Sequence, residues 1–255
     1  MPREVLYGRN PVYEALRAGR RRFFRLWLLE RAQIKGNLRA ALRLAEQRGV
    51  AVQRAPRGRL DALVGHGHHQ GVALEASPYP YADWGEMLAL ASARQEPPFL
   101  LLLDTLQDPQ NLATLLRSAE AVGVHGVLLP PRRAAAVTPA VVNASSGASE
   151  HLLIGQANLA QAMAALQERG LWVVGLEGSA DAQPPARVRL DGALALVVGS
   201  EGQGLRRLVR SRCDALLRLP MRGKVDSLNA AVAGSVALYL AWQRRGWAGA
   251  TGGEA

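Results

Sequence analysis

Three short segments of the sequence place polar side chains in loops that directly follow apolar runs. They are residues 108–117, 199–205 and 219–229. Amide, carboxylate, hydroxyl and guanidinium groups in such loops can bind a ligand and stabilise charge that develops during a reaction. The residues that carry these groups are Asn111, Arg117, Glu201, Ser227 and Asn229.

The first segment reads as the start of a helix. Residues 100–103 form an apolar run typical of a buried strand, and Asp108 followed by Pro109 is typical of an N-cap with proline at the first helical position. The apolar spacing of the next residues assigns one face to the core and leaves Asn111 and Arg117 on the other, near the carboxyl end of the sheet. A single arginine on such a face is usually a solvated charge.

The second segment is rich in glycine, but its spacing excludes the common phosphate loops. Glycines stand at 199, 202 and 204, and Leu205 follows. A dinucleotide fingerprint requires G-x-G-x-x-G, and a Walker loop requires Lys and then Ser or Thr after its last glycine. Taken alone, these glycines are turn residues at the end of a strand.

The third segment leads from a strand into a helix that we predict from Leu228 to about Trp242, capped by Ser227 or Asp226. Small residues crowd 230–237 of this helix. They suit close packing within the chain and a dimer seam equally well.

In this order, the three segments resemble the motifs of the SpoU/TrmH family of SPOUT methyltransferases, which use S-adenosylmethionine to methylate a ribose 2′-hydroxyl in RNA. The resemblance implies a trefoil knot in the C-terminal part, a homodimer, and a catalytic role for Arg117. It also implies that Gly199 touches the cofactor through its backbone, and that Glu201 orients Arg117 or offsets the sulfonium charge. Ser227 and Asn229 would face the ribose. The adenine would be walled by Leu219, Met221 and Leu228.

Arginine keeps its proton at neutral pH and is a poor base. We therefore expect Arg117 to hold a phosphate and to stabilise the developing alkoxide, and we leave the identity of the base open.

The charge of the chain is segregated. Residues 1–60 hold fifteen Lys and Arg against four Asp and Glu, a net +11, and the other 195 residues hold sixteen against seventeen, a net −1. Clustered arginine favours binding to an RNA backbone, although a solvated basic surface in an arginine-rich proteome would give the same charge pattern.

No apolar run reaches the ~20 residues of a membrane span, no signal peptide is visible, and Cys213 is the sole cysteine. We expect a cytoplasmic protein without a disulfide.

Composition breaks around 77–81 and 96–98 predict four parts: a small α/β RNA-binding domain over 1–76, a linker over 77–97, an α/β methyltransferase domain with a mostly parallel sheet over 98–247, and a tail over 248–255. Residues 6–12 and 69–72 resemble the substrate domain of the branch that methylates guanosine in 23S rRNA. Candidate RNA contacts are Arg9, Arg20, Arg21, Arg22, His69 and Gln70.

The histidines of the glycine-rich loop at residues 66–71, His66, His68 and His69, could alternatively bind a metal ion. The only further ligand close to them in the sequence is Asp61, so we expect no metal.

The sequence thus predicts guanosine 2′-O-methylation in 23S rRNA by a homodimer that uses S-adenosylmethionine. The alternatives are a tRNA ribose methyltransferase of the same family and a non-catalytic rRNA-binding assembly factor.

Overall fold

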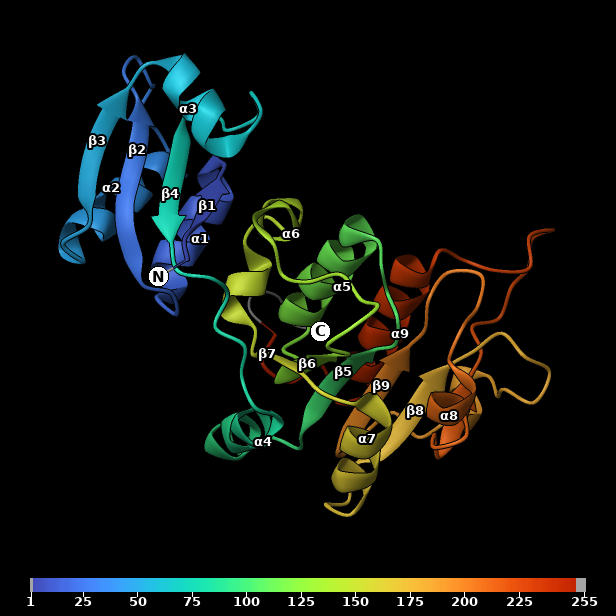
Figure 1. Cartoon of the computed structure of the whole chain (residues 1–255). Coiled ribbons are helices and arrows are strands. Elements are labelled where there is room, and N and C mark those ends of the chain that lie inside the picture. Colours follow the sequence, from blue (N-terminus) through green and yellow to red (C-terminus); the bar gives the residue numbers. More distant parts are fainter. Residues whose placement is uncertain (1, 251–255) are drawn as a thin grey trace. The chain divides into compact units, whose positions relative to one another are not determined.

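The computed structural model describes residues 2–250 (Figure 1). Its contacts divide the chain into two compact units. Unit 1 runs up to Pro80 and also includes Ala136–His151, and unit 2 comprises Tyr81–Ala135 and the chain from Leu152 onward. The predicted linker 77–97 is therefore shared between the units, and the segment 136–151 leaves the predicted catalytic domain to pack with unit 1. The predicted tail lies outside the described residues from residue 251 onward.

Unit 1 is built on a four-stranded sheet in the order β1-β4-β2-β3. The strands are β1 (Glu4–Tyr7), β2 (Phe23–Leu29), β3 (Ala51–Ala55) and β4 (Val72–Ala76), and only β2 and β3 are parallel. The helices are α1 (Arg9–Ala18), α2 (Asn37–Gln47), α3 (Arg57–Val64) and α6 (Pro139–Ala144), with a 3-10 turn at Ala148–His151.

A buried ion pair joins the two parts of the chain that make unit 1. The guanidinium of Arg21 donates to both carboxylate oxygens of Glu150, at 2.8 and 2.9 Å, and also to Glu4 at 2.7 Å. Burial opposes the charge, but the hydrogen bonds and charges of Glu150 and Glu4 outweigh it, so the pKa of Arg21 lies above its ordinary value. The neighbouring phenol of Tyr79 is buried beside it, and this burial raises the pKa of Tyr79 to about 12.

We expect Arg21→Ala to lower the free energy of unfolding by about 3–5 kcal/mol, because Glu150, only 1% exposed, would keep its charge without its partner. Arg22→Ala, at the exposed neighbouring position, should cost at most about 1 kcal/mol. Urea unfolding of the two variants measures the difference. Equal stabilities would show that the ion pair does not hold residues 136–151 in unit 1.

Unit 2 contains a six-stranded sheet in the order β10-β8-β9-β5-β6-β7, in which every pair is parallel. The strands are β5 (Phe99–Leu103), β6 (Gly126–Leu129), β7 (Ile154–Gln156), β8 (Trp172–Leu176), β9 (Leu194–Val198) and β10 (Ala215–Leu217). Parallel strands that are buried on both faces read as continuous apolar runs, which is why most of them could be predicted. The predicted α/β class is confirmed.

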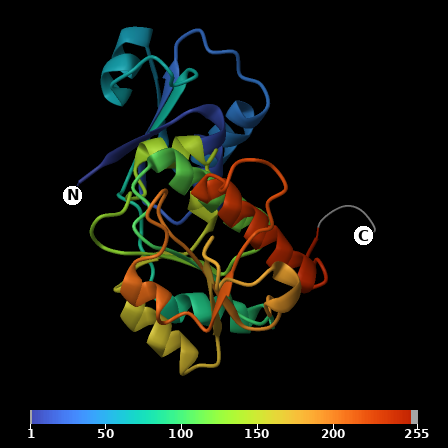
Figure 2. The ribbon, with the colours of Figure 1, turned by 90° about the vertical axis from the view of Figure 1, so that its right-hand side faces the viewer.

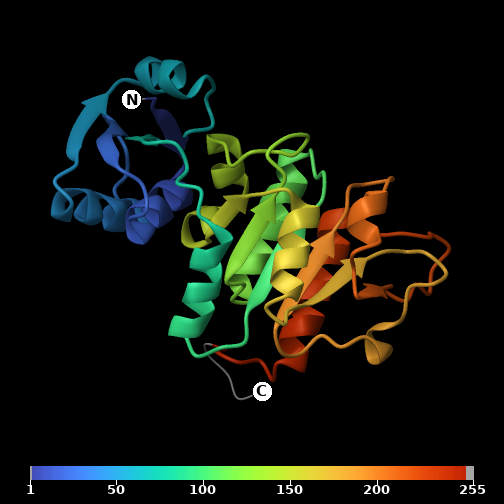
Figure 3. The same cartoon turned by 60° about the horizontal axis from the view of Figure 1, so that its bottom comes forward.

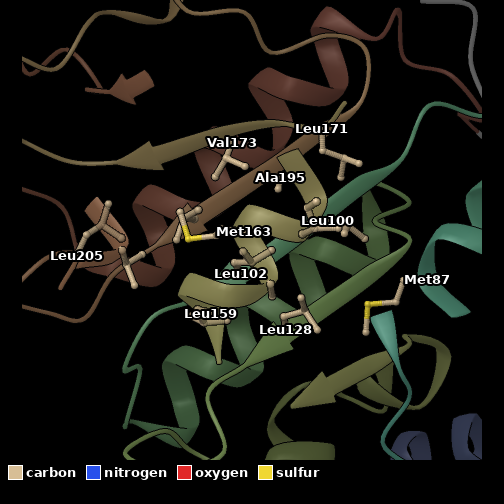
Figure 4. Close-up of a cluster of buried hydrophobic side chains, with 14 residues drawn as sticks. Met87, Leu100, Leu102, Leu128, Leu159, Met163, Leu171, Val173, Ala195 and Leu205 are labelled. Atoms are coloured by element: carbon tan, nitrogen blue, oxygen red, sulfur yellow. The ribbon is translucent and has the colours of Figure 1, made fainter. Parts of the chain in front are cut away.

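Helices cover both faces of this sheet. On one face, α4 (Trp84–Ala93), α7 (Leu159–Gln167) and α8 (Arg207–Arg210) pack on a cluster that includes Met87, Leu100, Met163 and Val197 (Figure 4). Figure 3 shows α7, in yellow, lying across the strands. The chain also forms a 3-10 turn at Pro185–Arg187.

The opposite face carries α5 (Pro109–Ala121) and α9 (Ala230–Arg244), which contact each other (Figure 2). A Cβ added at Gly234 would lie 2.5 Å from Leu115 of α5 and 3.2 Å from Val198 of β9. The small residues of α9 therefore serve packing within the chain at this position. None of the helices described is long and apolar enough to span a bilayer.

Candidate functional site

The three polar segments of the sequence meet at one edge of the unit 2 sheet. They follow β5, β9 and β10, and β5 and β9 are hydrogen-bonded neighbours. The carboxyl ends of parallel strands share one edge, which is where α/β sheets bind their ligands.

At this edge Asn111, Glu201 and Asn229 form a hydrogen-bonded cluster, which we call the polar triad. The side-chain amide of Asn111 donates to Oε1 of Glu201 at 2.7 Å. The amide of Asn229 donates to the same Oε1 and, at 3.1 Å, to Oδ1 of Asn111. The sequence predicted these residues as catalytic, but it did not predict that the carboxylate would bind both amides.

The helix that follows the third segment begins later than predicted. Its N-cap is Asn229, whose Oδ1 accepts from the backbone N–H of Ala231 and Val232 at 2.9 and 3.2 Å. Ser227 and Asp226 lie in the loop before it, so the predicted caps were wrong. Asn, Ser and Asp are all good N-caps, and the sequence alone could not choose among three candidates so close together. The cap fixes Asn229 at the triad.

The glycine loop after β9 closes by backbone contact. The N–H of Ser200 donates to the carbonyl of Gly204 at 3.1 Å, and the N–H of Gly204 donates to the carbonyl of Ser200 at 3.1 Å. A Cβ on Gly199 would lie 2.3 Å from the carbonyl carbon of Gly204, so no other residue fits there without moving the loop. Gly202 and Gly204 have φ values of 76° and 63°, the left-handed region that favours glycine. This geometry holds Glu201 toward the triad.

A buried carboxylate that the sequence analysis missed anchors the exit of this loop. Asp104, fully buried at the end of β5, accepts from the backbone N–H of Arg206 at 2.9 Å and from its guanidinium at 2.7 Å. The only sequence signal for this anchor was an acidic residue directly after an apolar run, and an acidic residue at that position by itself indicates no more than a turn. The pair ties β5 to the loop that carries Glu201.

A cavity of about 970 Å³ opens beside the triad. The four residues predicted to bind the cofactor all line it: buried Gly199, half-buried Leu219, and the more exposed Met221 and Leu228. Glu201, Ser227 and Asn229 line it as well. The volume lies at the upper end of the range for small-molecule sites, ~300–1,000 Å³.

Two predicted catalytic residues do not line this cavity: Asn111, which reaches it only through its hydrogen bonds in the triad, and Arg117. Arg117 is exposed on α5, six residues after Asn111, and lines neither of the two cavities at this edge.

Covalent catalysis by the cysteine finds no support, because burial raises the pKa of the Cys213 thiol to about 12.

In unit 1, two predicted RNA contacts are wrong. Arg21 is buried in the ion pair with Glu150, and His69 is 3% exposed. The ring of His69 accepts from the N–H of Gly71 at 2.9 Å and contacts Asp61 at 3.1 Å. Both side chains are engaged inside the unit, which a run of arginines or a glycine-rich loop does not reveal.

The other predicted RNA contacts remain accessible to different degrees. Gln70 is exposed and accepts from the backbone N–H and the Nε of Arg9 at 3.0 and 3.3 Å. Arg20 is half-buried and donates to Tyr79 and to the carbonyl of Pro80. Arg22 is exposed.

Arginines that stack on aromatic rings were also missed. The guanidinium carbons of Arg3 and Arg22 lie 4.4 and 5.4 Å from the ring of Phe24, and those of Arg25 and Arg59 lie 5.2 and 5.4 Å from Trp27. The sequence signal available for these stacks was the mixture of arginine and aromatic residues over 20–27. These stacks keep cations at defined places on the unit 1 sheet.

The comparisons with known proteins agree with this arrangement. The model of the SpoU rRNA Methylase family matches residues 98–239, and the model for RNA 2′-O ribose methyltransferase substrate binding matches residues 5–82. YacO of Bacillus subtilis (strain 168), named as a TrmH family tRNA/rRNA methyltransferase, is 42% identical over 245 residues, 95% of this chain and 96% of its own length. A tRNA/rRNA methyltransferase of Mycolicibacterium vanbaalenii is 42% identical over 246 residues, which cover 95% of this chain and 77% of the relative.

Among solved structures, the SpoU methyltransferase AviRb of Streptomyces viridochromogenes, in complex with AdoMet, matches with a TM-score of 0.77 at 22% identity, covering 95% of this chain and 90% of AviRb. An AdoMet-bound rRNA methyltransferase of Sinorhizobium meliloti matches with a TM-score of 0.76, also at 22% identity, covering 94% and 87%. At 22% identity these two structures support the fold and carry no information on function. The family model and the sequence relatives go further, and they establish that the chain belongs to the SpoU rRNA methylase family.

Proposed function

We propose that the protein transfers the methyl group of S-adenosylmethionine to the 2′-oxygen of a guanosine ribose in 23S rRNA. The observation that carries this proposal is the polar triad, of which Glu201 and Asn229 line the 970 Å³ cavity. The triad holds a carboxylate and two amides, next to a hydroxyl at Ser227, where a cofactor and an RNA ribose could meet.

The cavity fits the cofactor in two respects. Gly199 lines it, and because this residue has no side chain the backbone of Gly204 can close the loop that forms the wall. Leu219, Met221 and Leu228 supply apolar surface for an adenine. S-adenosylmethionine supplies a methyl group on a positively charged sulfur. Glu201 is one of three carboxylates in the lining, with Glu177 and Asp226, and it can offset that charge while the two amides hold its position.

The reaction would join the ribose oxygen to the methyl carbon, with S-adenosylhomocysteine as the leaving group and the hydroxyl proton released to solvent. The asparagine and serine side chains can orient the hydroxyl. Arg117 holds the adjacent phosphate and stabilises the developing negative charge, since a guanidinium binds phosphate oxygens in pairs. This assignment gives Arg117 a role on the RNA side, in keeping with its exposure and its distance along α5 from Asn111.

An RNA substrate is supported by the match of unit 1 to the substrate-binding model and by its excess of arginine, and the choice of rRNA follows the SpoU rRNA Methylase family to which residues 98–239 match. Mass spectrometry of rRNA and tRNA from a strain that lacks the gene tests it. We expect one 2′-O-methylguanosine to disappear from 23S rRNA. Loss of a methylated ribose from tRNA instead would favour the tRNA enzyme, and unchanged RNA would favour the non-catalytic assembly factor. We therefore also propose a cytoplasmic location.

We also propose that the active form is a homodimer whose seam includes α9, and that the C-terminal segment forms the knot implied by the family. Val232, Val236 and Tyr239 are 46%, 41% and 44% exposed and follow the spacing of one helix face. Gly234 faces Leu115 within the chain, so the seam would use these larger residues in place of the small ones. An exposed apolar stripe of this kind marks an interaction surface.

We expect Val236→Arg to dissociate the dimer. In a two-fold interface the change occurs twice, and burial of each charge would cost about 2 kcal/mol or more. Gln161→Arg adds the same charge at an exposed position of α7 and should leave the dimer intact. Light scattering at assay concentration reports the mass. A Val236→Arg protein that stays dimeric would place the seam elsewhere.

A further inference from the structure

A second cavity, of about 520 Å³, adjoins the glycine loop. It shares Ser200 and Glu201 with the larger cavity, and Asn111 of the triad also lines it. Both cavities therefore reach the same carboxylate. A molecule in the smaller one would meet the triad at Asn111 and Glu201.

The lining of this second cavity is polar and carries two arginines. Arg206 is held by Asp104 through its Nε and one terminal nitrogen, and 48% of its side chain is still exposed. Arg133 is exposed and forms no ion pair or side-chain hydrogen bond among the described residues. The carboxylates of the lining accept hydrogen bonds from neutral groups, Asp108 from the N–H of Gln110 and Glu201 from the two asparagines. Arg133 is therefore the cation of this lining that is left to bind an anionic ligand.

The backbone at two places in the lining is strained. Thr105 and Arg133 have φ values of 58° and 59°, in the left-handed region that residues other than glycine rarely adopt. Such strain gathers at ligand sites. The carbonyl of Leu106 accepts from the N–H of Ala135 at 2.8 Å, which ties the two strained segments together. Arg133 lines the same cavity as Asp108, the N-cap of α5.

We infer that the second cavity receives the ribonucleotide that accepts the methyl group, with Arg133 binding the phosphate on one side of it, Arg206 as the second cation, and Arg117 left for the phosphate on the other side. The ribose then lies at Asn111 and Glu201, between the phosphate and the larger cavity. Neutral polar side chains at Thr105, Gln107 and Gln203 can take the remaining hydrogen bonds. The inference rests on the proposed function, because it places the RNA substrate of that reaction.

The test compares Arg133→Ala with Arg132→Ala. Arg132 is the exposed neighbour, loses the same charge, and does not line the cavity. The probe is an unmodified 23S rRNA transcript, and its binding to the full-length protein is measured by filter binding across a salt series, with S-adenosylhomocysteine present. Cofactor affinity is measured by calorimetry, and thermal melting checks that both variants are folded.

We expect Arg133→Ala to weaken RNA binding by about 10- to 100-fold and to reduce the salt slope by about 1, with cofactor affinity unchanged. Arg132→Ala should change RNA binding less than about threefold, and Arg133→Lys should recover part of the loss. In methylation assays with the same transcript, KM for RNA should follow the binding.

Equal RNA affinities for Arg133→Ala and Arg132→Ala would overturn the inference, whatever the activity. A wild-type protein that binds the transcript through Arg133 without methylating it would instead leave the cavity assignment standing and overturn the proposed function.

Discussion

Replacing Arg117 by alanine is expected to reduce methyl transfer by about 10²- to 10³-fold while S-adenosylmethionine binds as in the wild type. The size follows from removing one group that stabilises developing negative charge. Cofactor affinity stays the same because Arg117 lines neither cavity and lies exposed on α5. Single-turnover methylation with saturating RNA measures the first quantity, and calorimetry measures the second.

Glu120→Ala is the matched control for this prediction, because Glu120 is also exposed on α5 and is not part of the proposed site. Arg117→Lys should restore part of the rate, since lysine keeps the charge but loses the paired donors. Wild-type turnover in the alanine variant would remove Arg117 from the mechanism. A large loss of cofactor affinity would move it to the cofactor side.

The second large effect is expected for Gly199→Ala, which should weaken cofactor binding by about 100-fold or more. The added Cβ would meet the carbonyl carbon and oxygen of Gly204 at 2.3 and 2.4 Å and the N–H nitrogen of Leu205 at 2.6 Å. All three are backbone atoms, so no change of rotamer relieves the clash. The loop must shift, and with it Glu201 and the shared wall of both cavities.

Gly202→Ala separates this clash from ordinary backbone strain. Gly202 has a φ of 76° and no atom within 4 Å of an added Cβ, so alanine there should cost only about 1 kcal/mol of stability. Isothermal titration with S-adenosylmethionine compares the two variants. If Gly199→Ala bound the cofactor as tightly as Gly202→Ala, the loop would not form the cofactor wall.

Much of the catalytic unit could be predicted because its strands are buried on both faces. The buried strand predicted at residues 100–103 lies within β5, and the mostly parallel sheet predicted for this unit is found, with every strand pair parallel. The short strands β1 and β7 were not predicted, because a run of three or four residues is too short to show the apolar pattern of a strand. The grouping of the three motifs followed from their positions after parallel strands.

Contacts between residues far apart in the sequence could not be predicted from local pattern. The ion pair of Arg21 with Glu150 spans 129 positions, and the hydrogen bond of Asn111 with Glu201 spans 90. Nothing near Arg21 distinguishes a buried arginine from its exposed neighbour Arg22. The fold decides that difference by bringing a second carboxylate, Glu150, to one of the two.

The most direct test of the proposed function is a reaction of the purified protein with S-adenosylmethionine and an unmodified 23S rRNA transcript, followed by nucleoside mass spectrometry. We predict 2′-O-methylguanosine at one position, formed by the wild type and reduced to trace amounts in Arg117→Ala. A methyl group on a base would contradict ribose methylation, and a methylated ribose formed only in a tRNA transcript offered in parallel would contradict the choice of 23S rRNA.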